Sequence, residues 1–281
     1  MDATARRDLE TVEREFSTLG QTGLLPLWGR YRWHLREDLP LTDPFAERLV
    51  LETKYDFAPI ERHIGGYGVA LWGHRSYRLD QVSRDYFRHH PDGFVANLGV
   101  GLDDPFQRVV PESGTMIDCD FPDVLAYRAK FLESHERRLV FSESMFEQQW
   151  MQPIQQAGYE DVQICMAGVT MYLHTHQMRD LLRLLSREFK RPRIAFDCLS
   201  PRGIKYLNRG MRKSVLPQQE VHWGLSGERE LREWIGPNFD IRVSSIFEGL
   251  QRNRFDLMTR MNIWGAELVN LAMFVEISPK P

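Results

Sequence analysis

A pair of glycines directly after an apolar run is the first feature of this sequence that could hold a ligand. The run FVANL, residues 94–98, leads into Gly99-Val100-Gly101, and two aspartates, Asp103 and Asp104, follow. Glycines at such a turn let the chain bend tightly and let a ligand approach the backbone. The third glycine of a dinucleotide fingerprint is absent and the aspartates would repel phosphates, so a cationic ligand fits better. The alternative is a turn that merely joins a strand to a helix.

Carboxylates follow the ends of the next two apolar runs. The run 115–119 is followed by Asp120, and the run 138–142 by Glu143-Ser144. An acidic residue about twenty positions after the glycines can accept both vicinal hydroxyls of a ribose. Glu143 could receive an adenine amino group while a neighbouring backbone NH serves a ring nitrogen. The alternatives are that Asp120 only caps the next helix and that Glu143 is a solvated loop carboxylate.

The elements that must position these residues alternate regularly after residue 93. Apolar runs alternate with amphipathic patterns, which predicts βαβ units and a Rossmann-like α/β fold with a mainly parallel sheet. Two later runs lack a simple βαβ connection and predict an antiparallel pair, a hairpin, at one sheet edge. The predicted strands are 94–98, 115–119, 138–142, 162–167, 193–198, 240–247 and 269–277, and the predicted helices lie near 103–110, 122–135, 145–157, 175–190 and 201–212.

Composition excludes several classes of protein. Of 281 residues, 42% are hydrophobic, and the formal net charge is −3, which argues against a basic nucleic-acid surface. The N-terminus is charged rather than signal-like, and no apolar run approaches the roughly 18 residues that span a bilayer. The three cysteines sit in apolar runs without metal-ligand or disulfide spacing. We therefore expect a soluble cytoplasmic protein without metal, membrane or nucleic acid; no pattern specifies its oligomeric state.

Several motifs in order resemble one known family. NLGVGLDDPFQR at 97–108 is followed by IDCDFPDVLAYRAKFL at 117–132, and this pair resembles the leucine carboxyl methyltransferase family, including its bacterial polyketide O-methyltransferase branch. Weaker matches support it over roughly residues 40–280. They are DPFAERL at 43–49, RSYRLD at 75–80, GVTMYL at 168–173 and HWGLSGERELREWI at 222–235.

The resemblance implies a fold and a cofactor. The fold is that of class I methyltransferases that use S-adenosylmethionine (SAM), with a seven-stranded sheet, an antiparallel edge and helices on both faces. Residues 1–92 would form a helical cap region, and residues 93–281 the SAM-binding domain. The cofactor would be SAM and the substrate a small molecule.

The resemblance also implies roles for single residues. The two glycines of the turn would lie beneath the methionine part of SAM, Asp120 would hold the ribose, and Glu143 and Ser144 would meet the adenine. Arg75 matches the arginine that binds the SAM carboxylate; its alternative is a surface ion pair with Asp80 or Glu61. The implied cofactor-binding set is completed by residues of the same motifs and reads Arg75, Asn97, Gly99, Gly101, Asp120, Glu143, Ser144 and Ala167.

The fourth strand departs from the family pattern. The family reads AEGxxMYL, whereas this chain reads MAGVTMYL, so Ala167 stands where a glutamate helps hold the SAM amino group. Either another group, such as Asp103 or a backbone carbonyl, takes the ammonium, or SAM sits differently. Tyr172, whose ring could favour the sulfonium, and His174, as a base, are the candidate catalytic residues.

Methyl transfer to a carboxyl or hydroxyl group of a small molecule, in secondary-metabolite biosynthesis, is the first functional hypothesis. Two alternatives remain open. Attack within SAM would give a cyclic product and methylthioadenosine, a reaction that the missing glutamate would favour because only an unprotonated amine is a nucleophile. The second alternative is a SAM-binding protein without catalysis.

Overall fold

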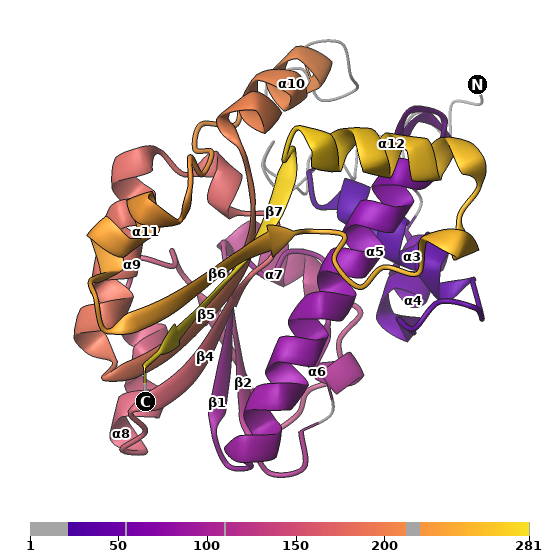
Figure 1. The fold of residues 1–281 in the computed structure, drawn as a ribbon. Helices are drawn as coiled ribbons and strands as arrows, with labels where there is room; N and C mark the ends of the chain where they lie inside the picture. The colour runs from indigo at the N-terminus through magenta and orange to yellow at the C-terminus, as the bar shows by residue number, and fades with distance from the viewer. Residues whose placement is uncertain (1–21, 54, 110, 212–219, 281) are drawn as a thin grey trace.

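Seven strands form one sheet with a cap of helices beside it (Figure 1). The computed structural model describes residues 22–280 except 54, 110 and 212–219, so the first 21 residues of the predicted cap region lie outside the described residues. The strand order is β3-β2-β1-β4-β5-β7-β6, which confirms the predicted Rossmann-like α/β fold. The strands are β1 (Phe94–Leu98), β2 (Thr115–Asp120), β3 (Arg138–Ser142), β4 (Asp161–Met166), β5 (Arg191–Leu199), β6 (Phe239–Ser245) and β7 (Ala272–Pro279).

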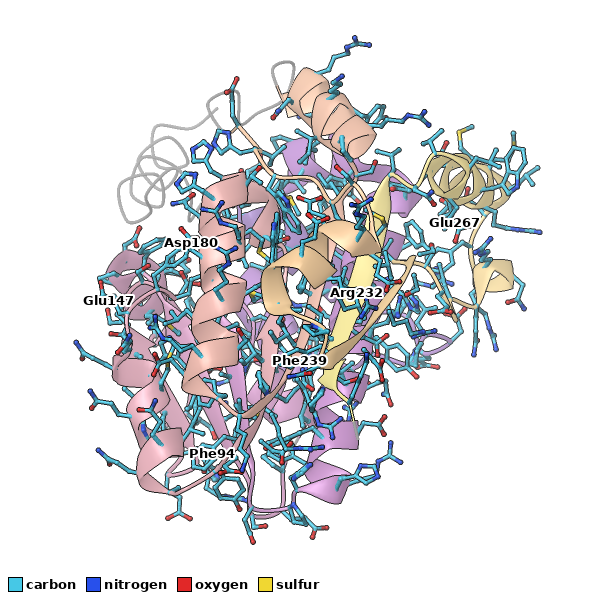
Figure 2. The ribbon with its side chains drawn as sticks, turned by 60° about the vertical axis from the view of Figure 1, so that its left-hand side comes forward. Phe94, Glu147, Asp180, Arg232, Phe239 and Glu267 are labelled. Carbon is cyan, nitrogen blue, oxygen red and sulfur yellow. The ribbon has the colours of Figure 1, made fainter. Side chains whose placement is uncertain are left out.

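The predicted antiparallel pair is confirmed, but its connection is longer than that of a hairpin. β7 runs antiparallel to both of its neighbours, β5 and β6. The chain leaves β6, passes through α12 (Leu257–Leu268) and returns as β7 between β5 and the edge strand. Figure 2 shows Glu267 on α12 far from Phe94 at the start of β1. The helix therefore lies toward the end of the sheet where the parallel strands finish.

Helices cover both faces of the sheet. α8 (Gln152–Gln156), α9 (Thr175–Glu188) and α11 (Glu228–Ile235) supply apolar side chains to the core on one face. α5 (Ala58–His89), α6 (Pro105–Val109) and α12 supply them on the other. The two layers of helices explain why every residue of β1 is buried.

The cap consists of α3 (Leu24–His34), α4 (Pro44–Glu52) and the first part of α5. Its own apolar cluster includes Leu27, Phe45 and Leu49 and continues onto α7 (Pro122–Arg128) through Tyr127. The long helix α5 bends at Gly65, whose φ of 52° suits glycine, and then runs down over β4 and β5. One helix thus extends from the cap to the ends of the strands. The predicted boundary between a cap region and a SAM-binding domain at residue 92 stays a prediction.

Two predicted helices are shorter than expected. The pattern at 122–135 forms a helix only to Arg128, whose buried side chain turns into the interior. The pattern at 145–157 becomes a 3-10 turn, Gln149–Met151, followed by α8, where Pro153 suits the first turn of the helix. α10 (Pro201–Met211) follows β5 directly and stands at the carboxyl ends of the strands (Figure 1). No helix within the described ranges is long and apolar enough to cross a membrane.

Candidate ligand site at the carboxyl ends of the strands

The glycine turn after β1 has the backbone shape that the sequence predicts. Gly99 and Gly101 have φ values of 70° and 60°, which only glycine adopts without strain. The Gly99 amide donates to the carbonyl of Cys119 at 2.8 Å, which fixes the turn against β2. A Cβ atom on Gly99 would lie 2.4 Å from Cγ1 of Val169. The turn is therefore in direct contact with the loop that follows β4.

Asp120 braces this turn from the end of β2. Its Oδ2 accepts a hydrogen bond from the Gly101 amide at 2.6 Å, and its Oδ1 accepts one from the Phe121 amide at 2.7 Å. Burial raises the pKa of Asp120, and these two amide hydrogen bonds oppose the rise. The N-cap of α7 is Phe121 and no side chain caps the helix, so the alternative that Asp120 only caps this helix is wrong. The carboxylate instead faces the glycine turn, and its contact with a ribose stays a prediction.

Glu143 and Ser144 follow β3 and organise the next loop. The Glu143 carboxylate accepts from the Trp150 amide at 2.8 Å through Oε1, and its Oε2 is buried without a hydrogen-bond partner among the described residues. Ser144 Oγ accepts from the Phe146 amide at 3.4 Å. Glu143 is consequently not the solvated loop carboxylate of the alternative interpretation, and contact of either residue with adenine stays a prediction.

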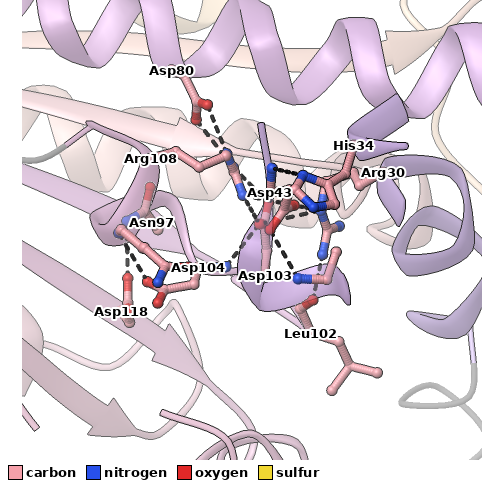
Figure 3. A network of polar contacts seen from close by, with 12 residues as sticks. Arg30, His34, Asp43, Asp80, Asn97, Leu102, Asp103, Asp104, Arg108 and Asp118 are labelled. Carbon is pink, nitrogen blue, oxygen red and sulfur yellow. Dashed lines mark hydrogen bonds and ion pairs between the residues drawn. The ribbon is translucent and has the colours of Figure 1, made fainter. Parts of the chain in front are cut away.

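Charged residues of the motifs form a buried network beneath the turn (Figure 3). The Arg108 guanidinium contacts three carboxylates, with Nε 2.7 Å from Asp80 Oδ2, Nη1 3.1 Å from Asp43 Oδ2, and a further pair of contacts to Asp103. Arg30 donates to Asp43 at 2.8 Å and lies 3.3 Å from Asp103. Although burial alone would raise the pKa of Asp103, the two arginines lower it, so Asp103 is an anion already neutralised by the protein.

A second chain of contacts ties β1 to β2 and α7. Asn97 donates from Nδ2 to Asp118 Oδ1 at 2.9 Å, and Asp118 in turn accepts from Arg128 at 2.6 Å. All three side chains are buried. Asn97 thereby fixes the strand that carries the glycine turn, and its predicted contact with a cofactor remains a prediction.

Arg75 reaches the ends of β4 and β5 from α5. Its Nη1 donates to Asp197 Oδ2 at 3.2 Å, and both side chains are less than a tenth exposed. A Cβ atom on Gly168 would lie 2.4 Å from Arg75 Nη1, so the guanidinium packs directly against this glycine. The predicted alternative, a surface ion pair with Asp80 or Glu61, is wrong, because those carboxylates contact Arg108 and Arg32 instead.

Tyr172 lies in the 3-10 turn Thr170–Tyr172 after β4, close to Arg75 and Asp197. Its side chain is partly buried against a small apolar cluster that includes Met171 and Leu199. Burial raises the pKa of Tyr172, so its phenol stays protonated at neutral pH. The ring is therefore available as an aromatic surface or a hydrogen-bond donor rather than as a phenolate base.

His174 is exposed on the far side of this loop. It caps α9, where its side chain accepts from a backbone amide of the first turn and its own amide donates to Gln177 Oε1 at 2.8 Å. Its ring stacks on His222 with a centroid distance of 4.1 Å. Among the described residues no cluster of His, Cys, Asp or Glu could hold a metal ion. Capping gives His174 a structural role, and its catalytic role stays a prediction.

Ala167 follows β4 on the face that packs under α5. A cavity of about 20 Å³ adjoins it and is also lined by Ser76, Asn97 and Gly99. Asp197, on the neighbouring strand β5, could not be identified from the sequence as a site residue, because it lies inside an apolar run thirty positions after Ala167.

Comparison with known proteins finds a matching family and a curated relative. A family model described as leucine carboxyl methyltransferase matches residues 28–186. The tetracenomycin polyketide synthesis O-methyltransferase TcmP of Streptomyces glaucescens is 25% identical over 167 residues, which are 59% of this chain and 60% of that relative. The chain thus matches less than two thirds of the relative's length.

A solved structure shares the fold. The crystal structure of a methyltransferase from Thermobifida fusca YX has a TM-score of 0.54 and 14% identity, and the match covers 78% of this chain and 84% of that chain. At this identity the likeness concerns the fold alone. The family model, in contrast, spans more than half of the sequence and includes the cap, the glycine turn and the loop after β4. The chain belongs to the leucine carboxyl methyltransferase family.

Proposed function

We propose that this protein transfers the methyl group of SAM to a carboxyl or hydroxyl oxygen of a small molecule. The observation that carries the proposal is the Asp120 carboxylate, which two backbone amides hold at the end of β2 facing the glycine turn. A carboxylate held in this position can accept hydrogen bonds from the hydroxyls of a ribose. The glycines beside it leave room for the group attached to that ribose to pass close to the backbone. Membership in a methyltransferase family supports SAM as the molecule that carries this ribose.

The proposed roles of the other residues follow from their positions at the carboxyl ends of the strands. Glu143 and Ser144, after β3, would meet the adenine, and the turn from Gly99 to Gly101 would lie beneath the methionine part. Arg75 would bind the SAM carboxylate, since its Nε is buried without a hydrogen-bond partner among the described residues. A buried guanidinium nitrogen of this kind is costly unless a ligand pairs with it.

Methyl transfer from SAM requires the protein mainly to align the acceptor with the methyl group. SAM supplies a methyl group on a sulfonium, which is already electrophilic, so the protein has to orient the acceptor and exclude water. Tyr172 offers an aromatic face beside the site, and cation–π attraction favours a positive charge there. A carboxylate acceptor requires no base, whereas a hydroxyl acceptor would need one. Burial keeps the Tyr172 phenol protonated, and His174 is exposed, so a carboxylate or an acidic phenol is the acceptor that this site supports best.

The acceptor is proposed to be apolar and aromatic. The relative TcmP is an O-methyltransferase of polyketide synthesis, and a related secondary metabolite is the proposed substrate here. Two helices at the same end of the sheet expose large apolar side chains, Tyr206 on α10 and Met261 and Trp264 on α12. The three cysteines are buried free thiols, which suits a reducing compartment, and we propose the cytoplasm.

The test is an analysis of products by mass spectrometry. The protein is incubated with SAM alone and with SAM plus aromatic carboxylic acids or phenols. S-adenosylhomocysteine and a methylated acceptor, formed only when both substrates are present, are the expected result. Methylthioadenosine formed from SAM alone well above the spontaneous rate would establish the cyclisation alternative, and binding of SAM without any product would indicate a non-catalytic SAM-binding protein.

A further inference from the structure

We propose that Asp197 accepts the ammonium of the SAM amino-acid end and thereby replaces the carboxylate that is missing at position 167. This assignment rests on the proposed function, since it names a further binding residue for the same cofactor. It concerns a residue that no motif of the sequence singled out.

The first argument is the register of the sheet. β4 and β5 are parallel, and their last aligned pair is Met166 with Phe196. If the same register is continued by one residue, Ala167, directly after β4, lies beside Asp197 of β5. Side chains alternate between the faces of a strand, and Cys165 and Ala195 both belong to the core under α5. Ala167 and Asp197 therefore share that face, so the carboxylate absent from one strand is present on its neighbour.

The second argument is the way in which Asp197 is held. Oδ1 accepts from the Gly168 amide at 2.6 Å, and Oδ2 accepts from Arg75 Nη1 at 3.2 Å. The next residues of the loop lead to Val169, which contacts the glycine turn at Gly99. Asp197 therefore binds Gly168, the residue directly before Val169, and Val169 contacts the glycine turn where the methionine part of SAM is proposed to lie.

The third argument is electrostatic complementarity. An α-amino acid presents an ammonium and a carboxylate side by side, and Arg75 and Asp197 present a guanidinium and a carboxylate side by side in a buried place. The pair is not saturated: a carboxylate offers about four acceptor sites, of which two are used, and Arg75 Nε has no partner among the described residues. The two groups can therefore bind the two ends of the zwitterion while they remain paired with each other.

The assignment has a consequence for the reaction. A carboxylate beside an amine favours the protonated form, and an ammonium has no lone pair with which to attack the carbon chain of SAM. Asp197 would thus suppress the cyclisation that the loss of a glutamate at Ala167 would otherwise permit. Of the two reactions of SAM considered above, methyl transfer to an external acceptor is then the one that remains.

The test compares ligands that differ in one charged group. Binding to the wild-type protein and to Asp197→Asn is measured by calorimetric titration with SAM, with decarboxylated SAM, which keeps the amine, and with deaminated S-adenosylhomocysteine, which lacks it. We expect Asp197→Asn to weaken SAM and decarboxylated SAM by roughly 10- to 150-fold, the range for a hydrogen bond to a charged group, and to leave the deaminated ligand nearly unchanged. The control Asp240→Asn, an exposed position on β6, should change none of the three affinities.

Each other outcome contradicts a defined part of the proposal. If SAM and the deaminated ligand are weakened but decarboxylated SAM is not, Asp197 acts through Arg75 on the carboxylate end alone. Equal losses for all three ligands would mean that Asp197 only supports the fold. Failure of the wild-type protein to bind SAM would overturn the proposed function itself.

A second variant restores the charge from the neighbouring strand. Ala167→Glu combined with Asp197→Asn places a carboxylate at the register partner and should recover most of the lost affinity for decarboxylated SAM. It also carries the test if the single asparagine variant does not fold. No recovery in a double variant with a wild-type melting temperature would overturn the assignment.

Discussion

Two buried groups of arginines and aspartates lie within the same site, and they differ in how completely the protein pairs them. Beneath the glycine turn, Arg108 contacts Asp43, Asp80 and Asp103, and Arg30 adds to the same cluster. At the ends of β4 and β5, in contrast, Arg75 contacts Asp197 through one nitrogen and leaves Nε without a partner among the described residues.

The difference separates residues that stabilise the fold from residues that we propose bind a ligand. The first group joins the cap to the turn, because Asp43 precedes α4, Asp80 lies on α5 and Asp103 follows the glycines. Because every carboxylate of that group is already paired with an arginine, the group has little left to offer a ligand. The second group has spare donors and acceptors at the place where the glycine turn meets the loop after β4. Family motifs thus contain both kinds of residue, and only their partners distinguish them.

The largest effect is expected where the network is broken at its centre. Arg108→Met should reduce the free energy of unfolding by about 3–5 kcal/mol, because it leaves buried carboxylates without their cation. Urea unfolding followed by circular dichroism measures this loss. The control is Arg88→Met on α5, whose exposed ion pair with Asp85 should contribute about 0–1 kcal/mol. Equal losses in the two variants would refute the central role of Arg108.

His74, the neighbour of Arg75, should make folding stability depend on pH. Burial lowers the pKa of His74 to about 4, and its Nε2 lies 2.8 Å from the carbonyl oxygen of Glu248. The unfolded chain takes up this proton near pH 6.5 but the folded chain only near pH 4, so stability is present above pH 6.5 and is lost as pH falls toward 4. The loss amounts to at most about 3.5 kcal/mol, at about 1.4 kcal/mol per pKa unit.

The variant His74→Gln isolates this contribution from other titrating groups. It keeps a donor for Glu248 but cannot take up the proton, so its stability should change less between pH 6.5 and 4 than that of the wild type. Parallel pH profiles for the two proteins, from urea unfolding at each pH, would show that His74 does not titrate in this way.

Arg75→Ala should separate the two ends of SAM. It removes the guanidinium proposed to bind the carboxylate, so SAM should bind about 1.5–3 kcal/mol more weakly, the range for a hydrogen bond to a charged group. Methylthioadenosine, which lacks the amino-acid end, should bind almost as before. The control Arg78→Ala lies one turn further along α5 and pairs with Glu248 and Glu276, so it should leave both affinities unchanged. Equal losses for both ligands would mean that Arg75 acts through the fold.

Asp120→Ala should have the smallest and least selective effect. Loss of the ribose contact should weaken SAM and methylthioadenosine alike by about 1–3 kcal/mol, since both ligands keep the ribose. Calorimetric titration below the melting temperature of the variant measures both affinities. An unchanged affinity would remove Asp120 from the site and leave it only the support of the Gly101 and Phe121 amides.

The sequence by itself determined the order of the strands along the chain and the turn that follows the first of them. Apolar runs and positive-φ glycines are local features, and each of the predicted strands at 94–98, 115–119 and 138–142 is present in the structure. The register of neighbouring parallel strands then brings their carboxyl ends to one edge. Asp120 could be predicted there because its position relative to the glycines is set by that regular geometry.

Only the tertiary structure decided which charged groups are saturated. Arg108 meets Asp43 across 65 residues of sequence, and Arg75 meets Asp197 across 122, and no local pattern specifies such pairs. Asp103 looked available for an ammonium in the sequence, yet two arginines from the cap side and from α6 already hold it. Asp197 looked like part of a buried strand, and it does lie within β5, yet its carboxylate contacts Arg75. The physical reason is that the cost of burying a charge depends on its partners in space, and those are fixed by the packing of α5 across the sheet.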